Sequence, residues 1–210
     1  MFAAWLERID GDAERAIPHC RRGLELAERI GSPFSIAWAL GSLAQVLAHA
    51  GSSESLGVAE RSVALCRERC TSLEGEGQHL AALAEACVLA GDLGRALRVA
   101  EEAVEVGRRR GIRRYELDAW LALARVLRAN GDATSLARAR DALAQVDALA
   151  DATKGPNWRC VAEYERAGIA GAAGDAAGRE RHLRTALAGF EAIEAEYRVQ
   201  QIRALLSAPA

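Results

Sequence analysis

A short turn motif recurs along the chain at nearly constant spacing, and this feature constrains the fold more than any other. Glycine can adopt a positive φ and end a helix, and an Asp or Ser after it can cap the next helix. Five glycines followed by Asp or Ser stand 40, 40, 40 and 43 residues apart: Gly11, Gly51, Gly91, Gly131 and Gly174. A fixed period of this length is typical of stacked repeats, so each motif predicts the turn of a helical hairpin.

Small and apolar residues keep a constant register around these glycines. Seven residues before each glycine stands an alanine: Ala4, Ala44, Ala84, Ala124 and Ala167. A residue this small allows the two helices of a hairpin to approach closely. A small residue followed by an aliphatic one recurs eleven to thirteen residues after the glycine. These positions return at steps of three or four residues and therefore mark one face of a helix.

The composition favours helices throughout the chain. Half of the residues are hydrophobic, which is enough to bury a core, but only 5% are aromatic. Alanine, the best helix former, is abundant, whereas the β-branched and aromatic residues that favour strands are scarce. We therefore expect an all-α fold.

This set of positions resembles the tetratricopeptide repeat (TPR). That family has a small residue seven positions before the turn glycine and alanines five and twelve positions after it. Ala16 and Ala96 occupy the first of these alanine positions, and Leu56 and Leu136 replace it in two repeats. The aromatic residue expected eleven positions before the glycine is present as Trp120, which we expect in the core. The usual TPR period is about 34 residues, so HEAT-type repeats, with periods near 40, remain an alternative.

The resemblance implies a right-handed α-solenoid of about five TPR-like helical hairpins, the first incomplete, plus a C-terminal capping helix. The expected repeats are 1–31, 32–71, 72–111, 112–152 and 153–195, and the capping helix is 196–207. First helices are expected at residues 2–9, 33–49, 74–90, 113–129 and 157–172. Second helices are expected at residues 13–30, 53–70, 94–109, 134–149 and 177–194. The three extra residues of the last spacing are expected in a longer loop within residues 150–157.

A finer likeness concerns the end of the chain. Long-period repeats rich in alanine and arginine are similar to the C-terminal arms of large bacterial signalling proteins, which combine an ATPase with a nucleotide-cyclase or a LuxR-type DNA-binding domain. The segment 174–206 looks like the closing part of such an arm. The likeness implies a non-catalytic protein–protein interaction scaffold, the regulatory arm of a bacterial signalling or transcription-control protein. The alternative is a small-molecule sensing domain that controls an attached ATPase or cyclase.

Charge and cysteine usage exclude several classes of protein. A net charge of -2 and a pI near 6.1 argue against a general nucleic-acid binder. No run of 18 apolar residues is present that would predict a membrane span. Five scattered cysteines form no disulfide framework and favour a reducing cytoplasm.

The sequence offers no arrangement typical of catalysis or of cofactor binding. Cys66 and Cys70 have a helical spacing that could hold a metal, but no second ligand pair accompanies them. None of the four histidines has a suitably spaced catalytic partner, and no catalytic motif is present. The arginine-rich segment 108–114 is expected to stabilise a helix end through the macrodipole. We therefore expect no enzyme activity, no metal and no cofactor.

The resemblance to TPR proteins also assigns a binding surface. In that family the first helices line a concave groove that binds a protein or peptide partner, and its positions carry over at fixed distances before each turn glycine. The expected partner-binding groove comprises Trp5, Trp38, Gln45, His49, Gln78, Glu85, Asp118, Arg125, Arg128 and Tyr164. Within this groove the arginines suit a partner's carboxylate, because a guanidinium can hold a carboxylate with two bonds.

The two ends of the chain are expected to behave differently. The first helix has about ten residues before Gly11, so Phe2, Trp5 and Leu6 have no preceding repeat to cover them. We expect either further repeats upstream or a homodimer through this open N-terminal edge. In the last helix, apolar residues share one face and predict a cap for the solenoid: Val199, Ile202, Leu205 and Leu206.

Overall fold

The computed structural model describes residues 12–207. Over this range the chain is helical and contains no strand, in agreement with the composition. The expected first helix at residues 2–9, Ala4, the groove residue Trp5 and the open N-terminal edge lie outside the described residues.

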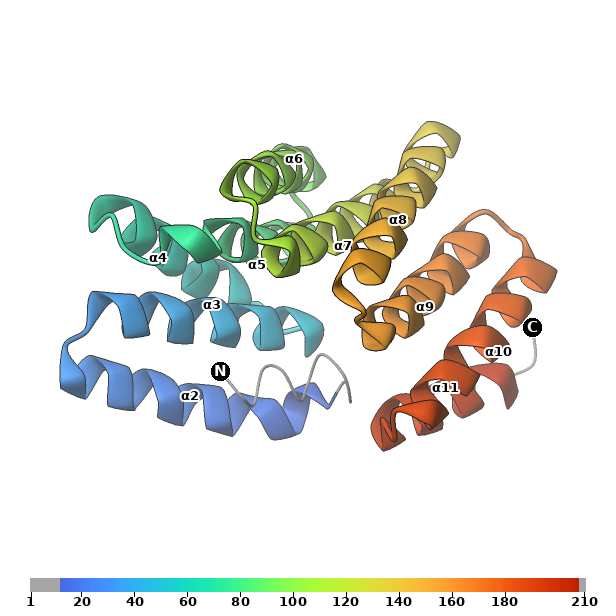
Figure 1. Ribbon diagram of the computed structural model, residues 1–210, viewed down its shortest axis with the longest axis horizontal. Coiled ribbons are helices and arrows are strands. Elements are labelled where there is room, and N and C mark those ends of the chain that lie inside the picture. The colour runs from blue at the N-terminus through green and yellow to red at the C-terminus, as the bar shows by residue number, and fades with distance from the viewer. Residues whose placement is uncertain (1–11, 208–210) are drawn as a thin grey trace.

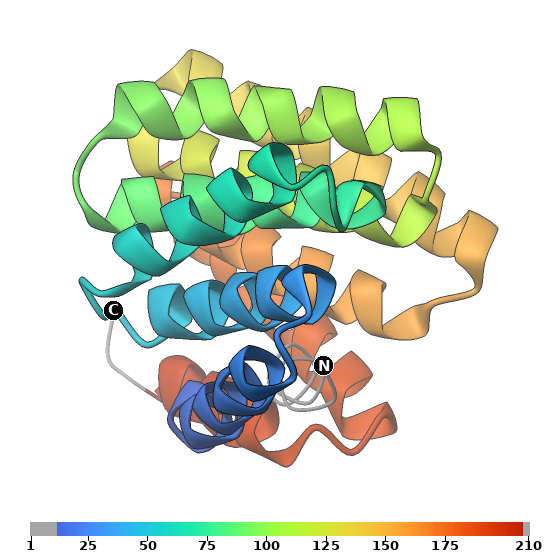
Figure 2. The ribbon, with the colours of Figure 1, turned by 90° about the vertical axis from the view of Figure 1, so that its left-hand side faces the viewer.

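Residues 12–207 contain ten α-helices and one short 3-10 helix. The α-helices are α2 (Ala13–Ile30), α3 (Pro33–His49), α4 (Ser55–Glu68), α5 (Glu76–Leu89), α6 (Leu93–Arg110), α7 (Arg113–Asn130), α8 (Ala133–Thr153), α9 (Pro156–Ala172), α10 (Ala176–Ala192) and α11 (Glu196–Ser207). The 3-10 helix η1 (Leu73–Gly75) precedes α5. Successive helices pair as hairpins that follow one another along the longest axis (Figure 1). The first helices of neighbouring hairpins also pack on one another, which gives the layered arrangement seen end-on in Figure 2.

Three of the four described hairpin turns are built as the sequence predicted, with a left-handed glycine and an Asp cap. Four turn glycines have φ between 71° and 79°: Gly51, Gly91, Gly131 and Gly174. The side chain of Asp92 accepts a hydrogen bond from the Arg95 amide, and that of Asp175 accepts one from the Gly178 amide. These bonds satisfy amides that a helix start leaves without an intrahelical partner. The turn at Ser52 is longer, and α4 starts only at Ser55 without a side-chain cap.

The alanine column is a packing column. Ala44, Ala84, Ala124 and Ala167 are at most 2% exposed, in agreement with the sequence analysis. Trp120 differs from the prediction, because it is only partly buried. Its indole ring lies under the Arg108 guanidinium, at 5.0 Å from the ring centroid, and its Nε1 donates to Glu116. A surface cleft between α6 and α8 opens onto this ring, so Trp120 packs against the core from one side and stays partly exposed.

Two glycines at the start of α5 permit close packing. A Cβ atom on Gly75 would stand 2.5 Å from Cζ2 of Trp38. A Cβ atom on Gly77 would stand 3.3 Å from the Cα atom of Gly107 on α6. These residues disfavour a helix by propensity, and α5 begins at Glu76 rather than at residue 74. Their small size is what the contacts with α3 and α6 require.

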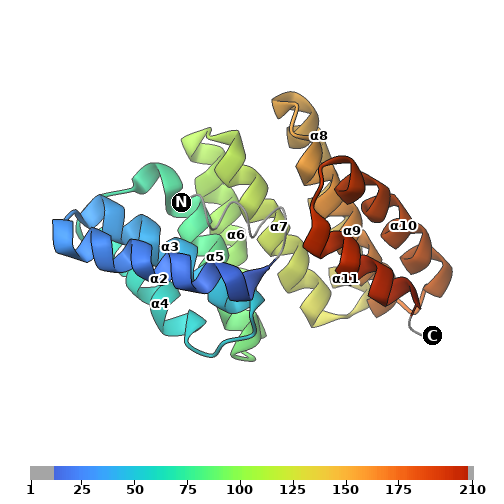
Figure 3. The same cartoon turned by 90° about the horizontal axis from the view of Figure 1, so that it is seen from below.

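The three extra residues of the last spacing lengthen a helix and not a loop, which corrects the expectation for residues 150–157. Helix α8 has 21 residues, and only Lys154 and Gly155 separate it from α9. Three helical residues advance the chain by about 4.5 Å and rotate its exit by about 300°. Helix α9 therefore packs on α7 less extensively than α5 packs on α3 or α7 on α5. Figure 3 shows α9, α10 and α11 as a unit beyond α7 and α8.

The last described helix turns its apolar face toward the helix before it. Helix α11 packs on α10, and its Val199 and Ile202 are buried while Leu205 and Leu206 are partly buried. The predicted apolar face therefore packs inward, more fully at Val199 and Ile202 than at Leu205 and Leu206.

Candidate functional site

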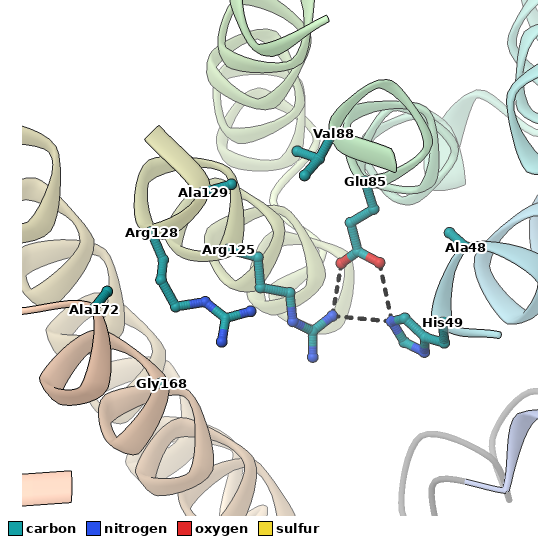
Figure 4. A pocket seen from close by; sticks show the side chains of 9 residues that line it. All are labelled: Ala48, His49, Glu85, Val88, Arg125, Arg128, Ala129, Gly168 and Ala172. Atoms are coloured by element: carbon teal, nitrogen blue, oxygen red, sulfur yellow. Dashed lines mark hydrogen bonds and ion pairs between the residues drawn. The ribbon is translucent and has the colours of Figure 1, made fainter. Parts of the chain in front are cut away.

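The first helices bring charged side chains together on the inner face of the stack. A cavity of about 390 Å³ lies at this place, and Figure 4 shows its lining. The lining residues come from α3, α5, α7 and α9: Ala48, His49, Glu85, Val88, Arg125, Arg128, Ala129, Gly168 and Ala172. Four of the predicted groove residues, His49, Glu85, Arg125 and Arg128, therefore meet in one pocket. The other lining residues are mostly alanine and glycine.

Arg125 is the centre of a network of ionic contacts. Its Nη1 donates to Glu85 Oε1 at 2.6 Å, and its Nε donates to Glu165 Oε1 at 2.6 Å. His49 Nε2 lies 3.0 Å from Glu85 Oε2 and 3.2 Å from Arg125 Nη1. Arg128 Nη2 lies 3.8 Å from Glu165 Oε2. We call these five residues the inner-face ion network; in Figure 4 Glu85, Arg125 and His49 converge from three helices.

The network is buried at its centre and open at one side. The side chains of Glu165, Glu85 and Arg125 are 6%, 9% and 19% exposed, whereas that of Arg128 is 38% exposed. Burial alone would raise the pKa of Glu85 and Glu165, but Arg125, together with His49 beside Glu85 and Arg128 beside Glu165, more than offsets burial and lowers both. Burial would likewise lower the pKa of Arg125, and the two carboxylates raise it. At neutral pH Arg125 is thus a cation held between two anions.

Glu165 is the member that the sequence analysis missed. Counting back from the turn glycine places Gly168, and not Glu165, in the column of Glu85 and Arg125. The longer α8 displaces α9, so that Glu165 meets Arg125 while Gly168 lies against Arg128. A Cβ atom on Gly168 would stand 2.3 Å from Arg128 Nη1, so the glycine makes room for this guanidinium. The sequence did contain a signal for this contact: charges of alternating sign stand exactly 40 residues apart, at Glu85, Arg125 and Glu165.

The other predicted groove residues in the described range do not line this pocket. Four of them are buried, with exposed fractions of 4% to 7%: Trp38, Gln45, Gln78 and Asp118. The Trp38 ring packs against the rings of Phe34, His79 and Tyr115. Tyr164 is partly buried, and the Arg198 guanidinium of α11 lies 5.2 Å from its ring centroid. In the structure, these five side chains pack against other parts of the protein.

A second polar cluster surrounds His79, which is 1% exposed. The Ser62 hydroxyl donates to the carbonyl of Ala37 at 3.0 Å, so Nδ1 of His79 donates to Ser62 Oγ at 3.1 Å. Nε2 then accepts from the Ser72 hydroxyl at 3.0 Å. Burial lowers the pKa of His79 to about 4, so the ring is neutral at physiological pH. Both ring nitrogens are satisfied inside the protein, and the cluster is structural.

The arginine-rich segment 108–114 is engaged in contacts within the protein. Arg110 pairs with Glu76, and Arg108 and Arg109 lie within 4 Å of glutamates on α7 and α6. Burial raises the pKa of the Cys66 thiol to about 11, and Cys70 is exposed. In the part of the chain that the structure describes, no group of three or more His, Cys, Asp or Glu residues could hold a metal ion. None of the helices within residues 12–207 is long and apolar enough to cross a membrane.

Comparison with known proteins identifies the fold. No family model and no curated protein sequence matches the chain. A single-substitution variant of a Podosopora anserina protein, named as a kinesin light chain with nearly identical TPR-like repeats, matches with a TM-score of 0.55. That match has 20% sequence identity and covers 91% of this chain and 92% of the other. A second structure of that protein gives a TM-score of 0.51 at 20% identity, covering 98% and 94%.

The chain has a TPR-like fold. The resemblance drawn from the glycine and alanine columns is confirmed at the level of the fold, and the 40-residue period is accommodated within TPR-like hairpins.

Proposed function

We propose that the chain is a non-catalytic protein–protein interaction scaffold that receives an acidic group of a protein partner at Arg128. TPR-like hairpins stacked in this way present an extended inner surface made by their first helices. The inner-face pocket lies on that surface and spans four of these helices.

The observation that carries this proposal is the difference between the two arginines of the pocket. Arg125 is already bound by two buried carboxylates. Arg128 is the more exposed, its contact with Glu165 is 3.8 Å long, and Gly168 leaves room for its guanidinium. A guanidinium in this position can donate two parallel hydrogen bonds to an incoming carboxylate.

We place this scaffold in the regulatory arm of a cytoplasmic bacterial signalling or transcription-control protein. The support is the likeness of segment 174–206 to the closing part of such arms. In this role the arm would hold a protein partner that controls an attached ATPase or cyclase.

The pocket volume favours a second candidate, a sensor of a small acidic ligand. Pockets for small molecules commonly measure roughly 300–1,000 Å³, and the cavity of about 390 Å³ lies in that range. The same guanidinium of Arg128 would hold the ligand's acid group.

A defined acidic peptide tests both candidates. A fluorescent peptide of four glutamates should bind the chain, as measured by fluorescence anisotropy, and a peptide of four glutamines should not. Arg128→Gln should weaken binding about tenfold or more, because a charge-assisted bidentate pair is lost. Arg184→Gln, on the exposed surface of α10, is the matched control and should leave binding unchanged.

Competition separates the two candidates. If free glutamate displaces the peptide as efficiently as the unlabelled peptide does, the small-molecule sensor is the correct function. Equal binding by the wild type and Arg128→Gln would show that this pocket is not the binding site.

A further inference from the structure

The junction before α9 lacks the ion pairs between second helices that join the earlier repeats. Second helices of neighbouring repeats are linked by exposed ion pairs: Arg61 with Glu28, Arg95 with Glu60, and Arg138 with Glu101. These pairs join α2 to α4, α4 to α6, and α6 to α8. Between α8 and α10, no ion pair is recorded within residues 12–207.

On the inner side, Glu165 is the ionic contact of this junction with α7, while Arg166 with Asp147 and Arg159 with Asp151 tie α9 to α8. Helix α9 packs sparsely on α7, because the three additional residues of α8 displace it. Glu165 reaches across to α7, where its two oxygens contact Arg125 at 2.6 Å and Arg128 at 3.8 Å. One carboxylate of α9 therefore occupies the two arginines that a partner's carboxylate would use.

We propose that Glu165 is a built-in competitor for the partner's acidic group, so that binding of this group releases Glu165 and opens the junction between α7 and the α9–α11 unit. This proposal rests on the proposed function of the pocket. A carboxylate in the pocket contacts Arg128 first, because that guanidinium is the exposed one. As it takes over the N–H groups of Arg125 and Arg128, Glu165 loses both of its cations, and α9 loses its ionic contact with α7.

The coupling must act in both directions. If binding of the partner's acidic group favours the open junction by a given factor, then opening the junction must strengthen binding of that group by the same factor. Glu165→Gln removes the competing charge with little change in shape, and should therefore both open the junction and strengthen acid binding. Coupling of this kind commonly changes affinity by about fivefold to 150-fold.

Glu85→Gln is the matched control. Glu85 also binds Arg125 at 2.6 Å, but it lies on α5, on the other side of α7 from α9. The variant removes one charge from the same arginine and leaves the contact with α9 in place. It should strengthen acid binding and leave the junction closed.

The experiment measures the junction and the affinity on the same proteins. Spin labels are attached at Cys70, the exposed cysteine near the end of α4, and at Thr185→Cys on the exposed side of α10. Pulsed electron paramagnetic resonance then gives their distance distribution with and without the peptide of four glutamates. Fluorescence anisotropy gives the affinity, and circular dichroism shows that each variant is folded.

We expect the wild-type distance to shift when the peptide saturates the protein, and Glu165→Gln to show the shifted distance without peptide. Glu165→Gln should bind the peptide at least fivefold more tightly than the wild type. The proposal is overturned, while the proposed function stands, if the wild type binds the peptide with no change in distance. It is also overturned if Glu85→Gln shifts the distance as much as Glu165→Gln does. Absence of peptide binding by all three proteins would overturn both the proposal and the proposed function.

Discussion

The stack from α3 to α8 and the unit formed by α9, α10 and α11 are joined to their neighbours in different ways. Within the stack the first helices pack broadly on one another, and exposed ion pairs link the second helices. At α9 the packing on α7 is sparse, and a buried carboxylate of α9 provides the inner contact. Three extra residues in α8, most of one turn, are enough to produce this change, because they displace every following element together. A short insertion in one helix can thus change how two repeats are joined, while the glycine and alanine positions of the repeats stay the same.

The two kinds of ion pair differ in their energetics. Exposed pairs such as Arg138 with Glu101 contribute about 0–1 kcal/mol each, since water and salt screen them. The buried pairs of Arg125 require the desolvation of three charges, and their attraction only offsets that penalty. Removing one partner from a buried network is therefore far more destabilising than removing one partner of an exposed pair.

Replacement of the central arginine should have the largest effect. Arg125→Ala leaves Glu85 and Glu165 buried without their main cation, and should lower the free energy of unfolding by about 3–5 kcal/mol at pH 7. Urea unfolding followed by circular dichroism measures this loss. Combining Arg125→Leu with Glu85→Gln and Glu165→Gln should recover much of the stability, because no unpaired charge then remains. A loss below about 1 kcal/mol for Arg125→Ala would mean that the buried ion network contributes no more than the exposed ion pairs of the earlier repeats.

The stability of the stack from α3 to α8 should depend on pH through its buried histidine, His79. Urea unfolding at a series of pH values measures this dependence. The pKa of His79 is about 4 in the folded chain and about 6.5 when the chain is unfolded. Between these values the unfolded chain binds the additional proton, so stability falls as the pH is lowered from 6.5 to 4. The total loss is about 3 kcal/mol, at up to about 1.4 kcal/mol per pH unit.

His79→Gln is the control for this titration. The variant should be less stable at pH 7 but should lose less stability between pH 6.5 and 4.5, where the carboxylates of the ion network are still charged. Hydrogen exchange should show α3, α4 and α5 opening with acid before α9 and α10. Parallel pH profiles for the wild type and the variant would contradict the neutral, buried state of His79.

Much of the fold could be read from the sequence because local signals specify it. The positive φ of Gly91 and the cap by Asp92 depend on a few neighbouring atoms, and the bounds of α2 and α3 agree with the prediction at both ends. The course of residues 150–153 depends on more than local preference. Ala and Asp there are compatible with a helix or a loop, and the chain leaves α8 only at Lys154, which adopts a positive φ of 52°.

The site could be predicted only in part, because some of its contacts depend on how the helices pack and not on local sequence signals. His49, Glu85, Arg125 and Arg128 were assigned to the inner face from their distance to the turn glycines, and they meet in the pocket. Glu165 was missed because its contact with Arg125 follows from the displaced position of α9. The burial of Trp38 likewise requires Gly75 to stand against its ring, a contact between two repeats that no periodic position reveals.

The smallest effect is expected on the outer surface of the stack. Arg138→Gln removes the pair with Glu101, whose two side chains are about half exposed, at 47% and 48%. Stability should fall by less than about 1 kcal/mol in low salt, and the difference should vanish at about 1 M salt, where the screening length is about 3 Å. Urea unfolding of the wild type and the variant at both salt concentrations measures this. The loss caused by Arg125→Ala should persist in 1 M salt, because ions do not reach the buried carboxylates. If both losses disappear in high salt, the contacts that hold α9 are no different from those that link the earlier repeats.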